Sequence, residues 1–368
     1  MLLKICPINF FSKNLKKINM LNMKRRRAIN SLQIINPMKN NSWQSILRIS
    51  MVIIGLAFSV NSFATHIVGG QLTYRCLGNN NYEIKLLLYR DCYNGNPAAS
   101  FDDPAPVGIY DGRTNQPVAV TGPFTINGKV LIPYTGEDTI HQTLVNDCGV
   151  RNTDVCVHRT IYTDTVNLPF NPDGYIFAYQ RCCRNYTVNN IVDPLETGST
   201  YFIKLTGAAQ LNCNTAANFK SWPDIYICTN SQLDFDHGAI DPDGDSLVYK
   251  LCVPSQGASL AIPNPAIPSN PPYDTVVWKA PFNLSNLMGG TTPLAIDANT
   301  GRLTAFPTII GQYLIGVCVD EYRGGELLSS TRRDFQYNVR ECDLPPIAAG
   351  AVASVECGNN TVAFQDQS

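Results

Sequence analysis

The sequence has little of the material from which common enzyme active sites are built. It contains four histidines in 368 residues, and it lacks a nucleophile elbow, a His-Glu-x-x-His zinc helix and a phosphate-binding glycine loop. No two cysteines are spaced as Cys-x-x-Cys, the arrangement typical of structural zinc sites and thioredoxin-like redox centres. These absences argue against the familiar hydrolase, metalloprotease and nucleotide-binding classes, and we expect no catalysis from residues 65–342.

Asp and Glu are missing from the first 64 positions. Ten of the 28 Lys and Arg residues precede Thr65, whereas all 29 acids follow it, which leaves 18 basic against 29 acidic side chains and a net charge near −11. An acidic chain of this kind argues against nucleic acid and anionic membrane as partners. The cysteines divide at the same point, because only Cys6 of the 13 lies before it.

This break coincides with the parts of a secretory signal peptide. Residues 49–60 are mainly apolar, Arg48 precedes them, and small residues including Ala64 follow. The apolar stretch is too short for a transmembrane helix of about 20 residues, and no second long apolar run exists in the sequence. We therefore expect a leader and signal peptide over 1–64, cleavage before Thr65, and a secreted or outer-surface mature chain without a transmembrane anchor. Whether the long leader is a true extension or an over-called start codon stays open.

Alternation of apolar and polar residues dominates the mature region and predicts an all-β fold. Residues 334–340 alternate without a break, so one face of this strand should pack on a core and the other should meet solvent. Turn signals such as Asp243-Gly244 and Thr300-Gly301 separate such segments, and no stretch predicts a helix of three turns. Short strands at this spacing favour tandem antiparallel β-sandwiches of the Ig-like or cadherin-like kind.

The 304 residues that follow the first 64 exceed one ordinary domain of about 100–200 residues. We expect a first β-sandwich over 65–215 and a second, cadherin-like β-sandwich over 216–342. Residues 343–350 are interpreted as a linker. Residues 351–368 predict a strand, a turn and a second strand, which cannot bury a core alone, and we interpret them as the start of a truncated PKD-like domain.

Four aspartates crowd one short segment of the second predicted sandwich. Hard Ca²⁺ prefers several oxygen ligands, and a turn can direct alternate Asp carboxylates at one point. We therefore consider a calcium site here and expect no other cofactor. The alternative is a solvated turn between two strands, in which Asp is a favoured turn residue; against it, four close carboxylates repel one another without a cation. The four residues are Asp236, Asp241, Asp243 and Asp245.

The cysteines after the leader are interpreted as structural, because an exported chain favours disulfides. Cys148 and Cys156 enclose a short loop and predict a local staple. Cys252 and Cys318 each lie in a predicted strand of the second sandwich and predict a bridge across it. Each closed loop would contribute on the order of 2–4 kcal/mol to stability.

Five segments carry a resemblance to a known group: Ala64–Gly70, Tyr89–Cys92, Tyr179–Asn185, Asp241–Leu247 and Arg332–Phe335. Together they resemble the N-terminal region of large gliding-motility-associated surface proteins that the type IX secretion system exports. The resemblance covers most of residues 65–342, and the final residues resemble the start of a PKD domain. It implies export by the type IX machinery and a place on the outer cell surface.

The most distinctive of these segments contains Arg-Cys-Cys-Arg-Asn. Its adjacent cysteines, Cys182 and Cys183, would point to opposite faces of a strand, so we expect each to have a different partner.

We interpret the chain as the non-enzymatic N-terminal part of a secreted surface protein with an adhesive or structural role, which the resemblance links to gliding motility. A glycan or another surface ligand would be its partner. One alternative is a set of accessory sandwiches belonging to an extracellular hydrolase whose catalytic domain lies beyond Ser368. Another is a carbohydrate-binding module in which Tyr82, Tyr89 and Tyr175 stack on sugars.

Overall fold

The structure is a computed structural model, and it confirms the all-β class. Antiparallel strands make up almost all of its regular structure, and the short helix α2 (Gly207–Leu211) is capped by the hydroxyl of Thr206, which accepts the backbone N–H of Ala209 at 3.0 Å. The residues that the structure describes are 67–93, 100–119, 125–126, 128–140, 155–342, 350–355 and 362–366.

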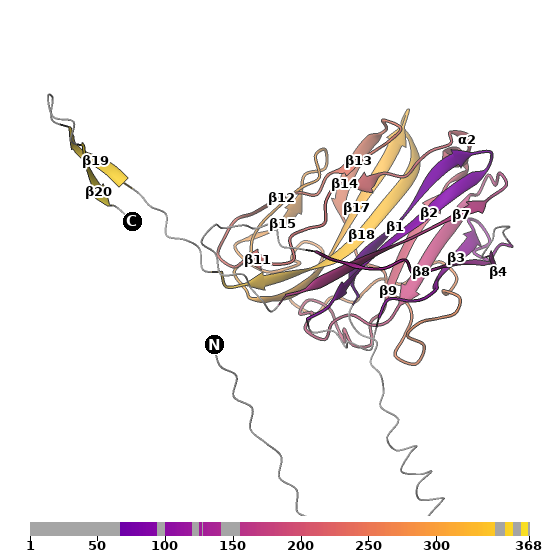
Figure 1. The fold of residues 1–368 in the computed structure, drawn as a ribbon, viewed down its shortest axis with the longest axis horizontal. Helices are drawn as coiled ribbons and strands as arrows, with labels where there is room; N and C mark the ends of the chain where they lie inside the picture. Colours follow the sequence, from indigo (N-terminus) through magenta and orange to yellow (C-terminus); the bar gives the residue numbers. More distant parts are fainter. Residues whose placement is uncertain are drawn as a thin grey trace, which may run out of the picture. The chain divides into compact units, whose positions relative to one another are not determined.

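An eight-stranded sheet joins strands from both halves of residues 67–342 (Figure 1). Its order is β14, β17, β18, β1, β2, β7, β6, and the short β11 pairs with β18 in parallel while the other pairings are antiparallel. The strands are β1 (Ile67–Gly78), β2 (Asn81–Asp91), β6 (Asp138–Ile140), β7 (Val157–Asn167), β11 (Ile227–Cys228), β14 (Ser246–Leu251), β17 (Gly311–Arg323) and β18 (Glu326–Arg340).

Smaller antiparallel sheets complete the architecture. A five-stranded sheet has the order β4 (Thr125–Ile126), β5 (Lys129–Ile132), β3 (Ala105–Asp111), β8 (Tyr175–Arg181), β9 (Ser199–Leu205), and a three-stranded sheet has the order β12 (Leu233–Asp236), β16 (Arg302–Phe306), β15 (Thr292–Ile296). Two pairs join β10 (Asn218–Phe219) to β13 (Ala239–Ile240) and β19 (Gly350–Val355) to β20 (Val362–Asp366).

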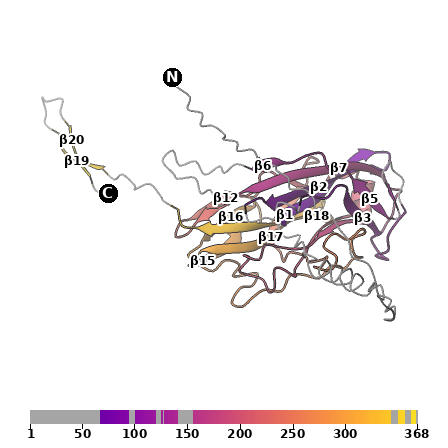
Figure 2. The same ribbon diagram turned by 60° about the horizontal axis from the view of Figure 1, so that its bottom comes forward.

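The two largest hydrophobic cores of the described residues lie on opposite faces of the eight-stranded sheet. Core 1 packs β1, β2 and β7 against the five-stranded sheet, and core 2 packs β17 and β18 against the three-stranded sheet (Figure 2). Leu88 of core 1 pairs with Gly70, and Gly70 also pairs with Asp334, so these residues share one face. Because successive side chains alternate, Phe335 of core 2 points to the other face.

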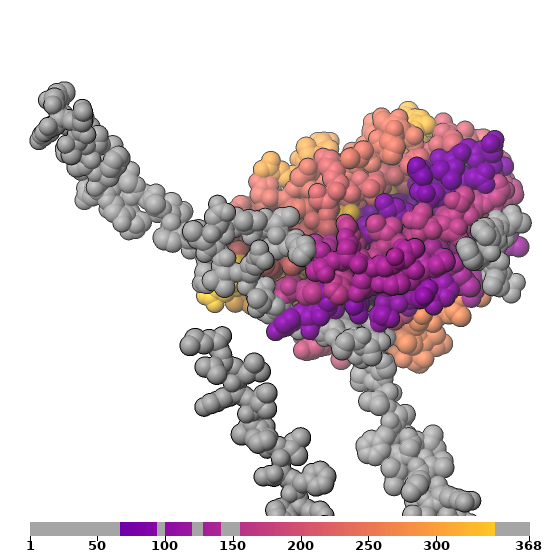
Figure 3. Space-filling view, viewed as in Figure 1, coloured from indigo at the N-terminus to yellow at the C-terminus, as the bar shows by residue number. Residues whose placement is uncertain are grey.

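The boundary predicted at residues 215/216 does not separate two sheets. Strand β1 belongs to the first half and β18 to the second, yet they pair directly, with Gly69 opposite Phe335. Figure 3 shows atoms of the first half, in indigo to magenta, directly beside atoms of the second half, in pink to orange. The two cores therefore share one continuous sheet, in place of the tandem sandwiches that the sequence predicts. Local alternation cannot specify which distant strands pair, so this arrangement was not visible in the sequence.

The prediction that the polar face of β18 meets solvent is wrong. Asp334, Gln336 and Asn338 are only 6%, 6% and 7% exposed. The chain that follows β8 supplies partners for the first two: the guanidinium of Arg184 pairs with Asp334 at 2.7 Å, and the amide of Asn185 donates to Gln336 at 3.2 Å. Asn338 accepts from Gln312 at 2.9 Å and donates to the carbonyl of Ile225 at 2.7 Å. The polar residues of the alternating pattern thus form a buried layer linked by hydrogen bonds and an ion pair, and these contacts satisfy most but not all of its polar atoms.

Candidate cation site

Three of the four predicted aspartates lie in the turn that joins β13 to β14. One carboxylate oxygen of Asp241 accepts the backbone N–H groups of Asp243 at 2.8 Å and of Asp245 at 3.1 Å. Gly244 has φ +81°, a left-handed conformation that glycine adopts without strain. Asx hydrogen bonding and this glycine together fold the segment back on itself, which brings alternate Asp carboxylates to one side.

A fourth carboxylate reaches the turn from β17. Glu321 lies opposite Leu247 in the pairing of β14 with β17. One oxygen atom from each of Asp241, Asp243, Asp245 and Glu321 lies within 4.8 Å of the others. We call these four residues the acidic cluster. Strand pairing therefore brings a residue that is distant in the sequence beside the turn.

Glu321 is completely buried, and its two oxygens differ in their surroundings. Oε2 accepts the backbone N–H of Ala217 at 3.1 Å and the hydroxyl of Ser329 at 2.7 Å. Oε1 has no hydrogen-bond partner among the described residues, and neither has the second, buried oxygen of Asp241. Burial, the largest influence, raises the pKa of Glu321 to about 7, and the nearby charge of Asp241 acts in the same direction.

One guanidinium offsets part of the negative charge of the acidic cluster. Arg323 donates from Nε and Nη2 to the two oxygens of Asp245 at 2.6 and 2.7 Å, and it lies 3.9 Å from Asp243. The hydrogen bond from Arg323 is the main cause that lowers the pKa of Asp245. With all four carboxylates ionised, a single arginine leaves three negative charges uncompensated at the cluster.

The acidic cluster also accepts hydrogen bonds from residues 213–217, the segment between the two cores that we call the connector. The backbone N–H of Thr215 donates to Asp243 at 2.6 Å, and that of Ala217 donates to Glu321. At its start the connector is joined to β1 by the disulfide between Cys76 and Cys213. The cluster therefore lies where the chain passes from core 1 to core 2.

Asp236, the fourth predicted ligand, is not part of the cluster. Its carboxylate pairs with Lys220 at 3.2 Å and accepts the backbone N–H of Gly238 at 2.8 Å. Sequence reasoning included it by proximity and missed Glu321, which follows 76 positions after Asp245. A signal for Glu321 exists in the pattern: Val317 and Val319 face core 2, so period-two alternation places residue 321 on the same buried face.

Five disulfides join cysteines among the described residues, and two bear on the predicted pairs. Cys252 and Cys318 are joined as predicted, with Cα atoms 5.9 Å apart. The predicted staple of Cys148 to Cys156 is wrong, because Cys156 bonds Cys92. Those two cysteines flank paired residues of β2 and β7, so the sheet brings them together across 64 positions. Cys148 itself lies outside the described residues.

The expectation of separate partners for Cys182 and Cys183 is also wrong, because they bond each other. Strand β8 ends at Arg181, so the alternation rule for strands does not apply to the two cysteines. The fifth disulfide joins Cys228 to Cys342.

The tyrosines considered for sugar stacking belong to the interior. Tyr82, Tyr89 and Tyr175 are 2%, 2% and 6% exposed. Their rings pack in the cores with the surrounding strands. These three side chains therefore offer no face to a glycan.

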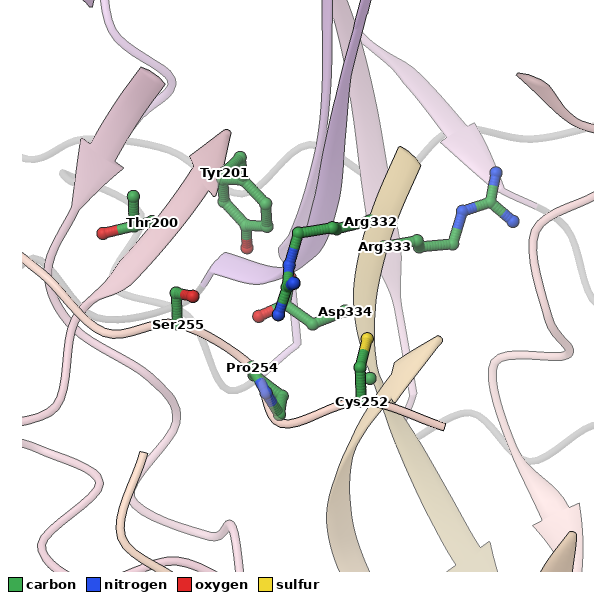
Figure 4. A pocket seen from close by; sticks show the side chains of 9 residues that line it. Thr200, Tyr201, Cys252, Pro254, Ser255, Arg332, Arg333 and Asp334 are labelled. Carbon is green, nitrogen blue, oxygen red and sulfur yellow. The ribbon is translucent and has the colours of Figure 1, made fainter. Parts of the chain in front are cut away.

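A small cavity lies between β9, the chain after β14, and β18 (Figure 4). Arg332 and Asp334 face Tyr201 and Ser255 in this view, whereas Arg333 points away from them. The cavity encloses about 10 Å³, which is room for about one water molecule. A substrate does not fit this cavity.

Comparisons of the chain with protein-family models, curated proteins and solved structures find no match. Within the described residues, no helix is long and apolar enough to cross a membrane.

Proposed function

We propose that this chain is the non-enzymatic N-terminal part of a secreted cell-surface protein, and that its folded body is a structural or adhesive module. The single observation that carries the proposal is the disulfide-fastened sheet. Four disulfides join cysteines whose sequence separations lie between 64 and 137. They cross-link both halves of the sheet on which the two cores pack. Disulfides in this number persist outside the reducing cytosol.

The location and the route of export form part of the same proposal. The signal-peptide pattern before Thr65 and the acidic mature region support secretion. Export by the type IX machinery, a link to gliding motility and PKD modules after residue 342 rest on the resemblance of the sequence segments. N-terminal sequencing of the exported protein tests the first step, with Thr65 expected as the first residue and retention of Arg48 as the opposing result.

The test of the role is a paired screen of the oxidised chain for binding and for turnover. We expect binding on a glycan or surface-ligand array without turnover of polysaccharide, peptide or ester substrates. Because Tyr82, Tyr89 and Tyr175 are buried, glycan binding should depend on other side chains. Turnover that disappears on changing a single Asp or Glu would contradict the structural or adhesive role and favour the hydrolase alternative.

A further inference from the structure

The acidic cluster contains a buried carboxylate that the described protein groups satisfy only at one of its two oxygens. Glu321 is 0% exposed, and its Oε1 has no hydrogen-bond partner among the described residues. Leaving a buried charged group without a partner is strongly unfavourable, so such groups are normally paired or coordinate a metal. The second oxygen of Asp241 is buried and unpartnered in the same way. The arrangement therefore suits a positively charged ligand that prefers oxygen atoms.

The spacing of the carboxylates suits one particular kind of ion. Ca²⁺ binds oxygen at about 2.3–2.6 Å, so two ligands on opposite sides of the ion lie about 5 Å apart. The four carboxylate oxygens lie within 4.8 Å of one another, which matches this span. Asp243 is exposed, so water has access to complete the six to eight ligands that Ca²⁺ takes. Nitrogen and sulfur ligands are not among the four, which disfavours zinc and copper.

We propose that Asp241, Asp243, Asp245 and Glu321 bind one Ca²⁺ ion, and that the ion fixes the connector 213–217 between the two cores. The connector depends on the cluster because the N–H groups of Thr215 and Ala217 donate to Asp243 and Glu321. An ion that fixes the positions of these two carboxylates also stabilises the two hydrogen bonds that they accept. Arg323 supplies one positive charge on the Asp245 side, and the ion supplies the charge on the Glu321 side.

The test is thermal unfolding of the oxidised full chain in EDTA, Ca²⁺ and Mg²⁺. A ligand that binds only the folded state stabilises it by mass action, so the melting temperature should rise by about 5 °C at a free Ca²⁺ concentration 100 times Kd. Calorimetric titration should give one Ca²⁺ per chain. A melting temperature unchanged up to about 10 mM Ca²⁺, well above the Kd of extracellular calcium modules, would overturn the proposal. An equal rise in Mg²⁺ would overturn the assignment to calcium.

Four variants separate the cluster from an ordinary acidic turn. Asp241→Asn keeps the oxygen that caps the turn, and Glu321→Gln keeps the shape of the buried side chain; both should lose most of the rise caused by Ca²⁺. Asp236→Asn and Asp297→Asn are the matched controls, because Asp236 bonds Lys220 and Gly238 instead, and Asp297 caps its own turn through Thr300. A lost rise in the controls, or a full rise in both cluster variants, would refute this ligand set.

Amide hydrogen exchange tests the connector directly. Ca²⁺ should slow exchange at Thr215 and Ala217 in the wild type, because their N–H groups donate to ligand residues, and should leave the Asp297 turn unchanged. The same measurement on Asp241→Asn provides a second readout if Glu321→Gln fails to fold. A raised melting temperature without slower exchange at the connector would refute the role of the ion in fixing it.

Discussion

The substitution Arg184→Met should strongly destabilise the protein, because it leaves a buried carboxylate without its partner. Arg184 is 0% exposed, and its Nη2 bonds Asp334 at 2.7 Å and the carbonyl of Ser255 at 3.2 Å. Removing one member of a buried ion pair costs about 3–5 kcal/mol. The remaining charge of Arg332 still favours the ionised form of Asp334, so we expect a loss near the lower end, about 3 kcal/mol.

Removing both charges should restore most of that stability. Two of the nitrogens of Arg184, Nε and Nη1, have no hydrogen-bond partner among the described residues, so the native pair is incompletely satisfied. Buried pairs of this kind are often replaced by apolar residues with little change in stability. The double variant Arg184→Met with Asp334→Leu should therefore lie within about 1 kcal/mol of the wild type.

The assay is denaturant unfolding of the oxidised chain at pH 7 and pH 4, with an exposed pair as control. Arg75 pairs with Glu83 at 3.0 Å, and its side chain is 58% exposed, so Arg75→Met should change stability by less than about 1 kcal/mol. Burial raises the pKa of Asp334, and loss of Arg184 raises it further, so the penalty should shrink as falling pH protonates Asp334. A loss below about 1 kcal/mol for Arg184→Met, or a double variant no better than the single one, would refute this reasoning.

Three further outcomes follow from the buried groups and the disulfides. His237 is completely buried, neither ring nitrogen has a partner in the described structure, and burial holds its pKa well below 6.5. Because the unfolded chain then binds the proton more readily, the free energy of unfolding should fall by about 1.4 kcal/mol per pH unit below about pH 6.5. The variant His237→Phe should remove this part of the pH dependence. The variant with Cys252→Ala and Cys318→Ala opens a loop with a sequence separation of 66 and should lose about 4 kcal/mol in denaturant unfolding. Peptide mapping without reduction should recover Cys92 linked to Cys156, and a free thiol at either position would contradict the pairing of β2 with β7 at that end.

Local sequence determined the elements of this fold because its signals act over a few residues. Alternation specified that residues 334–340 form a strand, and they do so within β18. The Asp-Pro-Asp-Gly-Asp segment specified a turn, since Asx hydrogen bonds and a glycine with positive φ depend only on near neighbours. Cysteines in predicted strands of one half, Cys252 and Cys318, were also paired correctly.

Apart from the pair Cys252 and Cys318, tertiary structure decided which distant segments meet. Pairing of β1 with β18 replaced two predicted sandwiches by one shared sheet, and pairing of β2 with β7 joined Cys156 to Cys92. The pairing of β14 with β17 placed Glu321 beside the aspartates of the acidic cluster, whereas Asp236 forms an ion pair with Lys220 instead. The sequence determines the alternation of each strand, but the partner of a strand depends on long-range packing, which local patterns do not contain.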